Sequence, residues 1–120
     1  KGDPQKRPRY ASAILQAVDK TTAETLRFEA KIGEPIRYKD LVLTVHACES
    51  TASDEGYDDS FAHMDIQAQS EALTHQPARV VFRGWMFANS PGLPPVESPL
   101  YDVWLIACKT AEPVAPGVKL

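Results

Sequence analysis

Histidine and cysteine are the side chains in this sequence that most readily bind a metal ion or serve as a nucleophile. The chain has three histidines and two cysteines. His46 and Cys48 are two positions apart, so a strand through them would place both on one face. The others, His63, His75 and Cys108, are scattered, whereas structural zinc sites draw ligands from closely spaced pairs. We therefore predict no metal site and interpret the histidines as surface or half-buried side chains.

A polar segment at 54–59 carries four acidic side chains around Gly56 and could suggest calcium binding. It lacks the alternating ligand positions of an EF-hand loop, so a solvated surface loop is the better interpretation. A serine nucleophile would need a histidine and an acid beside it. Ser90 stands before Pro91 rather than in a Gly-x-Ser-x-Gly turn. The sequence therefore predicts no catalytic residue, no cofactor and no enzymatic activity.

The two cysteines, Cys48 and Cys108, are separated by 60 positions, and each ends an apolar, strand-like run. Two cysteines in separate strands of a small domain suggest one disulfide, formed in an oxidising compartment. Two unrelated buried thiols in a cytosolic protein would fit the same positions. The residues alone leave both possibilities open.

Runs of alternating or apolar residues, separated by turn residues, predict strands throughout the chain. At 25–32, Thr, Arg, Glu and Lys alternate with Leu, Phe, Ala and Ile, which is typical of a half-buried strand. We expect one all-β domain over 11–110, an antiparallel sandwich or small barrel of six to seven strands. A flexible basic N-terminal arm at 1–10 and a flexible C-terminal tail at 111–120 flank it. The predicted strands are 12–18, 25–32, 36–38, 41–48, 61–69, 79–88 and 101–108.

The composition is that of an ordinary globular domain of 120 residues with a net charge of −3. This charge gives no electrostatic basis for binding nucleic acid. No apolar run approaches the roughly 18 residues that a membrane-spanning helix needs, so we predict no transmembrane segment. The chain opens with Lys-Gly-Asp-Pro, without the apolar region of a signal peptide, and we expect a mature form.

Aromatic residues are concentrated at 82–108, which holds both tryptophans. Aromatic side chains bury large areas, so we expect this segment to nucleate the core, with Trp85 and Trp104 largely buried. The alternative is a binding groove lined by Trp85, Phe87, Tyr101 and Trp104.

The stretch 82–91, Phe-Arg-Gly-Trp-Met-Phe-Ala-Asn-Ser-Pro, is followed by Ser-Pro-Leu-Tyr-Asp-Val-Trp at 98–104 and by Cys108. This pattern resembles the family called domain of unknown function 2155, and the likeness covers roughly 15–108. Ser98 stands where the family commonly has histidine, which argues against a catalytic role at that position. The positions that match the family motif, which we interpret as structural, are Gly84, Trp85, Met86, Ser90, Pro91, Pro99, Tyr101, Asp102 and Trp104.

Members of that family are small exported proteins of alphaproteobacteria, so the resemblance implies a periplasmic mature form. It also implies that Cys48 and Cys108 form a disulfide, because that compartment is oxidising. Genes of the family often neighbour a gene for an accessory subunit of respiratory complex I. The resemblance thus implies this complex as the candidate partner.

We therefore expect a periplasmic, non-catalytic accessory domain that docks onto an inner-membrane protein complex and is held at the outer face of that membrane by its partner. The connection at 90–99 holds four prolines and one glycine, and the prolines stiffen it, so presenting a contact there costs little conformational entropy. The expected partner-binding residues are Leu93, Pro94, Pro95 and Val96 in this connection, with Lys6, Arg7 and Arg9 in the arm. The alternative is a cell-envelope enzyme or small-ligand binder that uses an aromatic groove near Trp85 and Tyr101.

Overall fold

The computed structural model describes residues 10–52, 56–70, 77–93 and 95–109. Seven β-strands occur in this part of the chain, and it contains no helix that could cross a membrane. The predicted arm (apart from Tyr10) and the predicted tail lie outside the described residues. Four of the expected partner-binding residues and one of the histidines also lie outside the described residues: Lys6, Arg7, Arg9, Pro94 and His75.

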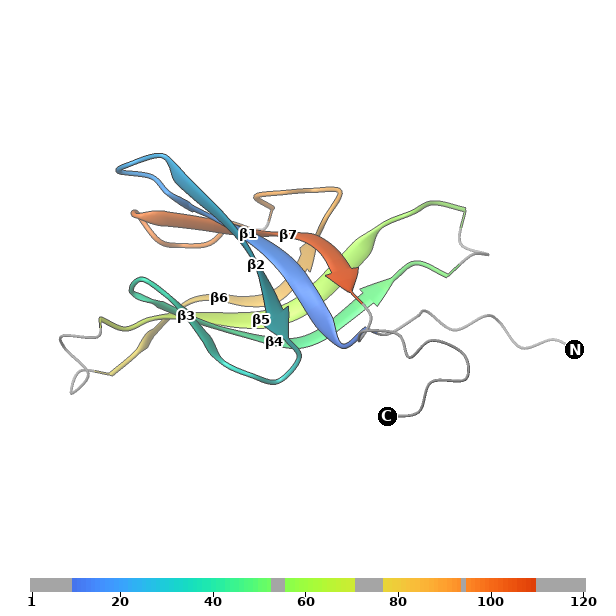
Figure 1. Ribbon diagram of the computed structural model, residues 1–120, viewed down its shortest axis with the longest axis horizontal. Helices are drawn as coiled ribbons and strands as arrows, with labels where there is room; N and C mark the ends of the chain where they lie inside the picture. Colours follow the sequence, from blue (N-terminus) through green and yellow to red (C-terminus); the bar gives the residue numbers. More distant parts are fainter. Residues whose placement is uncertain (1–9, 53–55, 71–76, 94, 110–120) are drawn as a thin grey trace, which may run out of the picture.

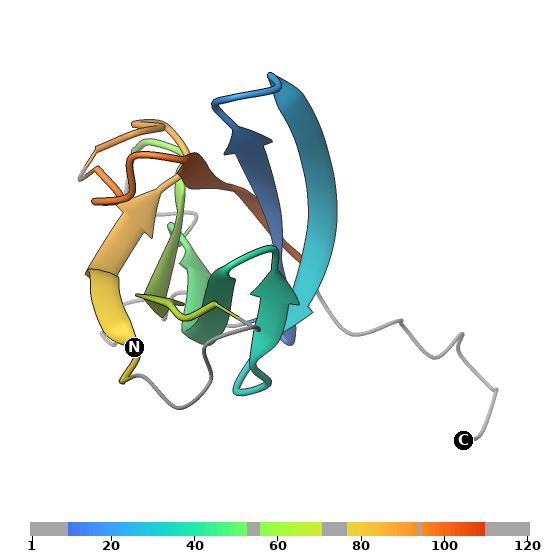
Figure 2. The same cartoon turned by 90° about the vertical axis from the view of Figure 1, so that its left-hand side faces the viewer.

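The strands are β1 (Ser12–Asp19), β2 (Glu24–Lys31), β3 (Ile36–Tyr38), β4 (Leu41–Ser50), β5 (Ser60–Ala68), β6 (Arg79–Phe87) and β7 (Tyr101–Lys109). They form two antiparallel sheets that face each other (Figure 1). The smaller sheet has the order β2-β1-β7, and the larger sheet has the order β3-β4-β5-β6. Figure 2 shows β2 and β6 at opposite sides of the molecule. The predicted all-β fold is confirmed, as a sandwich of seven strands.

Side chains that alternate along the strands fill the space between the sheets. In β1, Ala13, Leu15 and Ala17 are fully buried, whereas Ile14 and Gln16 are on the other face. The larger sheet contributes the opposing layer of the core, which includes Leu41, Leu43, Val45, Met64 and Ile66. The period-two pattern of the sequence therefore becomes the core of the sandwich.

A β-bulge in β4 sets the direction in which the first cysteine points. Val45 and Ala47 are opposite consecutive residues of β5, so His46 is an extra residue in the ladder. Because side chains alternate along a strand, one extra residue reverses the phase. Val45 and Cys48 are both buried, while His46 between them is exposed. The prediction that His46 and Cys48 share a face is wrong for this reason.

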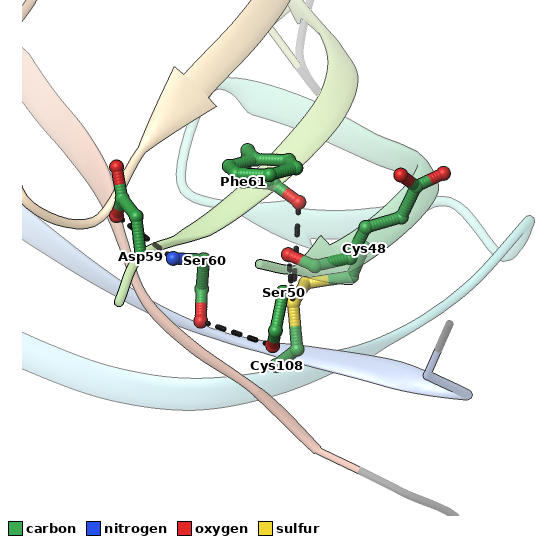
Figure 3. Close-up of a disulfide and its surroundings, with 7 residues drawn as sticks. Cys48, Ser50, Asp59, Ser60, Phe61 and Cys108 are labelled. Carbon is green, nitrogen blue, oxygen red and sulfur yellow. Dashed lines mark hydrogen bonds between the residues drawn. A yellow bond between two sulfur atoms is a disulfide. The ribbon is translucent and has the colours of Figure 1, made fainter. Parts of the chain in front are cut away.

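A β-bulge also precedes the second cysteine. Leu105 and Ala107 of β7 are opposite consecutive residues of β1, so Ile106 is extra and Cys108 turns toward the core. The Cα atoms of Cys48 and Cys108 are 5.7 Å apart, and the disulfide implied by the family resemblance is confirmed (Figure 3). The bond joins the larger sheet to the smaller one.

The connection between β6 and β7 packs against the sandwich rather than standing away from it. Val96 is only 8% exposed and belongs to the core cluster. The amide of Glu97 donates to the carbonyl of Val81 (2.8 Å), and the Ser98 hydroxyl accepts from two backbone amides (3.2 Å each). The expectation that Val96 is presented to a partner is therefore wrong. Leu93, at 66% exposure, is on the surface as expected.

A buried carboxylate lies at the end of the smaller sheet that is remote from the disulfide. Asp19, the last residue of β1, accepts hydrogen bonds from the hydroxyl (2.6 Å) and amide (2.9 Å) of Thr21 and from the Lys39 ammonium (2.9 Å). These hydrogen bonds, led by the Thr21 hydroxyl, hold the pKa of the Asp19 carboxyl well below its usual value. The hydrogen bond between Lys39 and Asp19 also raises the pKa of the Lys39 ammonium. The cluster ties the turn after β1 to the turn between β3 and β4.

Candidate binding face

Neither tryptophan lies in the core between the sheets. Trp85 is 39% exposed, and Trp104 is half-buried and outside the core cluster. Trp104 is on the outer face of the smaller sheet, where it lines a hollow with Pro91 and Val96 of the connecting loop. The prediction that both indoles are largely buried is wrong for Trp85, and Trp104 meets it only in part.

The register between β5 and β6 explains the position of Trp85. Met86 is opposite Ala62 and both are buried, so this pair points into the core. Trp85 and Phe87 flank Met86 and therefore point away from the core, and each is 39% exposed. Gly84, just before them, has a φ of 145°, a conformation that favours glycine. This accounts for the glycine of the family motif.

Five rings form a continuous row on the outer face of the larger sheet, which we call the aromatic face: His46, His63, Trp85, Phe61 and Phe87. The centroid distances are 5.7 Å between the two imidazoles and 5.2 Å from His63 to Trp85. Phe61 is 6.2 Å from Trp85 and 5.6 Å from Phe87. These spacings are favourable for ring pairs. Phe61 is only 5% exposed although it is outside the core cluster, so the rings pack on one another.

Two open hollows adjoin the aromatic face, and Trp85 and Glu49 line both. The first has a volume of about 460 Å³ and is also lined by Tyr10, Ile32, His46 and His63. The second has a volume of about 370 Å³ and is also lined by Tyr57, Phe61 and Phe87. The face is therefore hollowed on either side of one indole ring.

A charged network borders the rings. Asp65 accepts hydrogen bonds from Arg83 Nε (2.9 Å) and from His46 Nε2 (3.0 Å). Burial raises the pKa of the Asp65 carboxyl, but these two hydrogen bonds outweigh it and hold that pKa below its usual value. The carboxylate is thus ionised at neutral pH and fixes both donors beside the aromatic face. No group of three or more His, Cys, Asp or Glu side chains that could hold a metal ion occurs in the described ranges.

The predicted site residues are not gathered in one place. Tyr101 is buried and packs edge-on against Tyr38, with ring centroids 5.6 Å apart. It is therefore on the inner side of the sheets, whereas Trp85 is on an outer face, and the predicted groove shared by Trp85 and Tyr101 is wrong. Leu93 and Pro95 are exposed on the connecting loop.

Phe61 was not among the candidate residues, although the sequence held a signal for it. Phe61 and His63 alternate in one predicted strand, and Trp85 and Phe87 alternate in another. Each pair must therefore occupy a single face of its strand. The sequence does not show that these two strands pair with each other. That pairing brings the four side chains together on one surface.

Residues 13–108 match the family model described as "Uncharacterized protein conserved in bacteria (DUF2155)". The chain is also 25% identical over 99 residues to "Uncharacterized protein RP359" of Rickettsia prowazekii (strain Madrid E), which covers 82% of this chain and 61% of that protein. The chain thus spans about three fifths of this relative's length. No solved structure matches it. Because the family match includes both cysteines and every residue of the aromatic face, the resemblance noted in the sequence is confirmed and the chain belongs to the DUF2155 family.

Proposed function

We propose that this protein is a non-catalytic binding domain that docks onto a protein partner through the aromatic face. One observation carries the proposal: Trp85 and Phe87, each 39% exposed, project from the same face of an edge strand and pack on further rings. Single exposed apolar residues are common, but a contiguous aromatic surface marks an interaction site. Tryptophan and other aromatic residues supply much of the binding energy of protein interfaces.

The partner belongs to the cell envelope in this proposal. A disulfide persists in an oxidising compartment, which supports a periplasmic location. The family resemblance supports an inner-membrane complex as the partner, with respiratory complex I as the candidate. The domain is then an accessory subunit held at the outer face of the inner membrane. Leu93, exposed on the connecting loop, is a second point of contact.

Photocrosslinking in the bacterium that makes the protein tests this. A photoreactive phenylalanine analogue at Phe87 keeps a ring on the aromatic face. The same analogue at Leu26 is the matched control, because Leu26 is an exposed apolar residue on β2, in the other sheet. We expect a covalent adduct with one membrane protein from position 87 and none from position 26, and we expect the uncrosslinked protein in the periplasmic fraction.

The identity of the adduct decides between the parts of the proposal. A subunit of complex I in the adduct supports the candidate partner, and another membrane protein overturns that candidate only. No adduct from position 87, or equal adducts from both positions, overturns docking through the aromatic face.

Small-ligand binding is a second candidate function, and the two hollows beside Trp85 favour it. Their volumes of about 460 and 370 Å³ are within the range of ligand sites, roughly 300–1,000 Å³. Native mass spectrometry of protein purified from its own bacterium tests it. A bound mass that is lost in Trp85→Ala supports this function, and an unliganded mass that matches the chain alone argues against it.

A further inference from the structure

Within the described part of the chain, the outer edge of β6 has no backbone partner along part of its length. β6 is the last strand of the larger sheet, so β5 pairs with one of its edges, and no other described strand pairs with the second edge (Figure 2). The amide of Ala88, just after β6, donates to the carbonyl of Ser60 on β5 (2.9 Å). Backbone groups alternate between the two edges of a strand. Arg83 and Trp85 are five and three residues before Ala88. Their backbone N–H and C=O groups therefore point away from β5, to the open edge.

Both ends of this edge are closed by the chain itself. The carbonyl of Val81 accepts from the Glu97 amide (2.8 Å), and the carbonyl of Phe87 accepts from the Ser90 amide (3.0 Å). The open stretch is 82–86, about 17 Å long at the rise of an extended strand. This is the length of a common β-strand.

Two of the other three edge strands, β2 and β3, are protected against strand pairing, whereas this stretch of β6 is not. β2, at the edge of the smaller sheet, has charged side chains at Glu24, Arg27, Glu29 and Lys31, and such charges discourage strand pairing. β3, at the far edge of the larger sheet, has only three residues. After Arg83, β6 continues Gly-Trp-Met-Phe without a charge. An unprotected edge flanked by exposed rings is suited to pairing with another chain.

We propose that an extended segment of the protein partner pairs with β6 as a fifth strand of the larger sheet. This inference rests on the proposed function and specifies how the partner is held. Main-chain hydrogen bonds to Arg83 and Trp85 supply affinity, as in other strand-addition complexes, and side chains on one face supply specificity. Alternate residues of the segment lie beside Arg83 and Trp85, and its end reaches the Phe87 ring just beyond the open stretch. The Arg83 side chain is largely exposed although its Nε donates to Asp65 (2.9 Å), so the segment carries an acidic residue next to it. Apolar or aromatic residues of the segment lie next to the two rings.

Two variants at Arg83 separate backbone pairing from side-chain contact. Arg83→Ala removes only the side chain. Arg83→Pro also removes the backbone N–H that points to the open edge, and edge strands tolerate proline at such positions. The reporter is the photoreactive residue at position 87, and the measurement is the yield of the partner adduct in cells at equal protein levels. We expect Arg83→Pro to give about tenfold less adduct than Arg83→Ala, since a lost hydrogen bond at a buried interface weakens binding by this order.

The outcomes are distinguishable. Equal adduct yields from the two variants overturn strand addition and leave docking through the aromatic face intact. Absence of adduct from the otherwise unaltered chain overturns the proposed function and this inference with it. An adduct with a second copy of this chain assigns the edge to self-association and overturns the assignment to another protein.

If Arg83→Pro lowers the melting temperature, a second measurement that does not use this variant tests the inference. Amide hydrogen exchange of the crosslinked complex is compared with that of the free chain. We expect the exchange of the Trp85 amide to slow at least tenfold in the complex, with the Met86 amide, which already faces β5, as the internal control. Unchanged exchange at Trp85 overturns the inference.

Discussion

Removing the disulfide is expected to lower the free energy of unfolding by about 4 kcal/mol. Cys48 and Cys108 close a loop with a sequence separation of 60. In the chain-entropy relation, a loop of this length restricts the unfolded chain by about 14 cal/mol/K, which is about 4 kcal/mol at 25 °C. A domain of this kind has a total stability of about 5–15 kcal/mol. A Cys48→Ala/Cys108→Ala variant should therefore be folded but much closer to its unfolding threshold.

Urea unfolding followed by tryptophan fluorescence measures this loss in three samples: the oxidised protein, the same protein reduced with a thiol, and the double alanine variant. Reduction keeps both sulfur atoms in place, so the reduced sample isolates the effect of the crosslink from that of packing. We expect the unfolding midpoint to fall in both samples and the slope m to rise, because the unfolded chain without the crosslink exposes more surface. A loss below about 1 kcal/mol in both samples would refute the reasoning.

Three further predictions concern single residues. Trp85→Ala should lower the free energy of unfolding by about 1–2 kcal/mol, against about 2–5 kcal/mol for Leu43→Ala, because Leu43 is fully buried and Trp85 is not; equal losses in denaturant unfolding would place the indole in the core. Hydrogen bonds from Thr21 and Lys39 lower the pKa of Asp19, so their contribution to stability is present above about pH 4 and is lost as the pH falls below it. Asp19→Asn should therefore flatten the acid decline of the melting temperature, and an unaltered decline would contradict this. Leu93→Asp should leave the melting temperature unchanged, while Val96→Asp should lower stability by about 2–4 kcal/mol because it buries a charge in the core; a thermal melt of each variant compares them.

The strands could be predicted from the sequence because a run of alternating or apolar residues marks each of them. In β2, Leu26, Phe28 and Ala30 alternate with charged residues, and this pattern is evident in the order of the amino acids. The bulges could not be predicted in this way. An extra residue such as His46 has meaning only relative to the strand that it faces, and a single strand carries no record of its partner.

The aromatic face was missed for a related reason. Alternation separates Trp85 and Phe87 from Met86 but does not say which set faces the core. The large hydrophobic area of the tryptophan favours its burial. The register with β5 instead places Met86 in the core. Likewise, the stiffness of the 90–99 connection was readable from its prolines, whereas the burial of Val96 depends on where that connection folds back.

The two bulges make the disulfide a test of correct folding. Each cysteine points inward only because an extra residue, His46 or Ile106, has shifted the phase of its strand. A chain that pairs its strands in straight register would leave the thiols on opposite outer surfaces, where they could not meet. Oxidation therefore captures only molecules in which both sheets have already formed with their irregularities in place. Deleting either extra residue should block crosslinking while leaving the hydrophobic content of the chain nearly the same, so insertions and deletions near these positions would be tolerated less than substitutions.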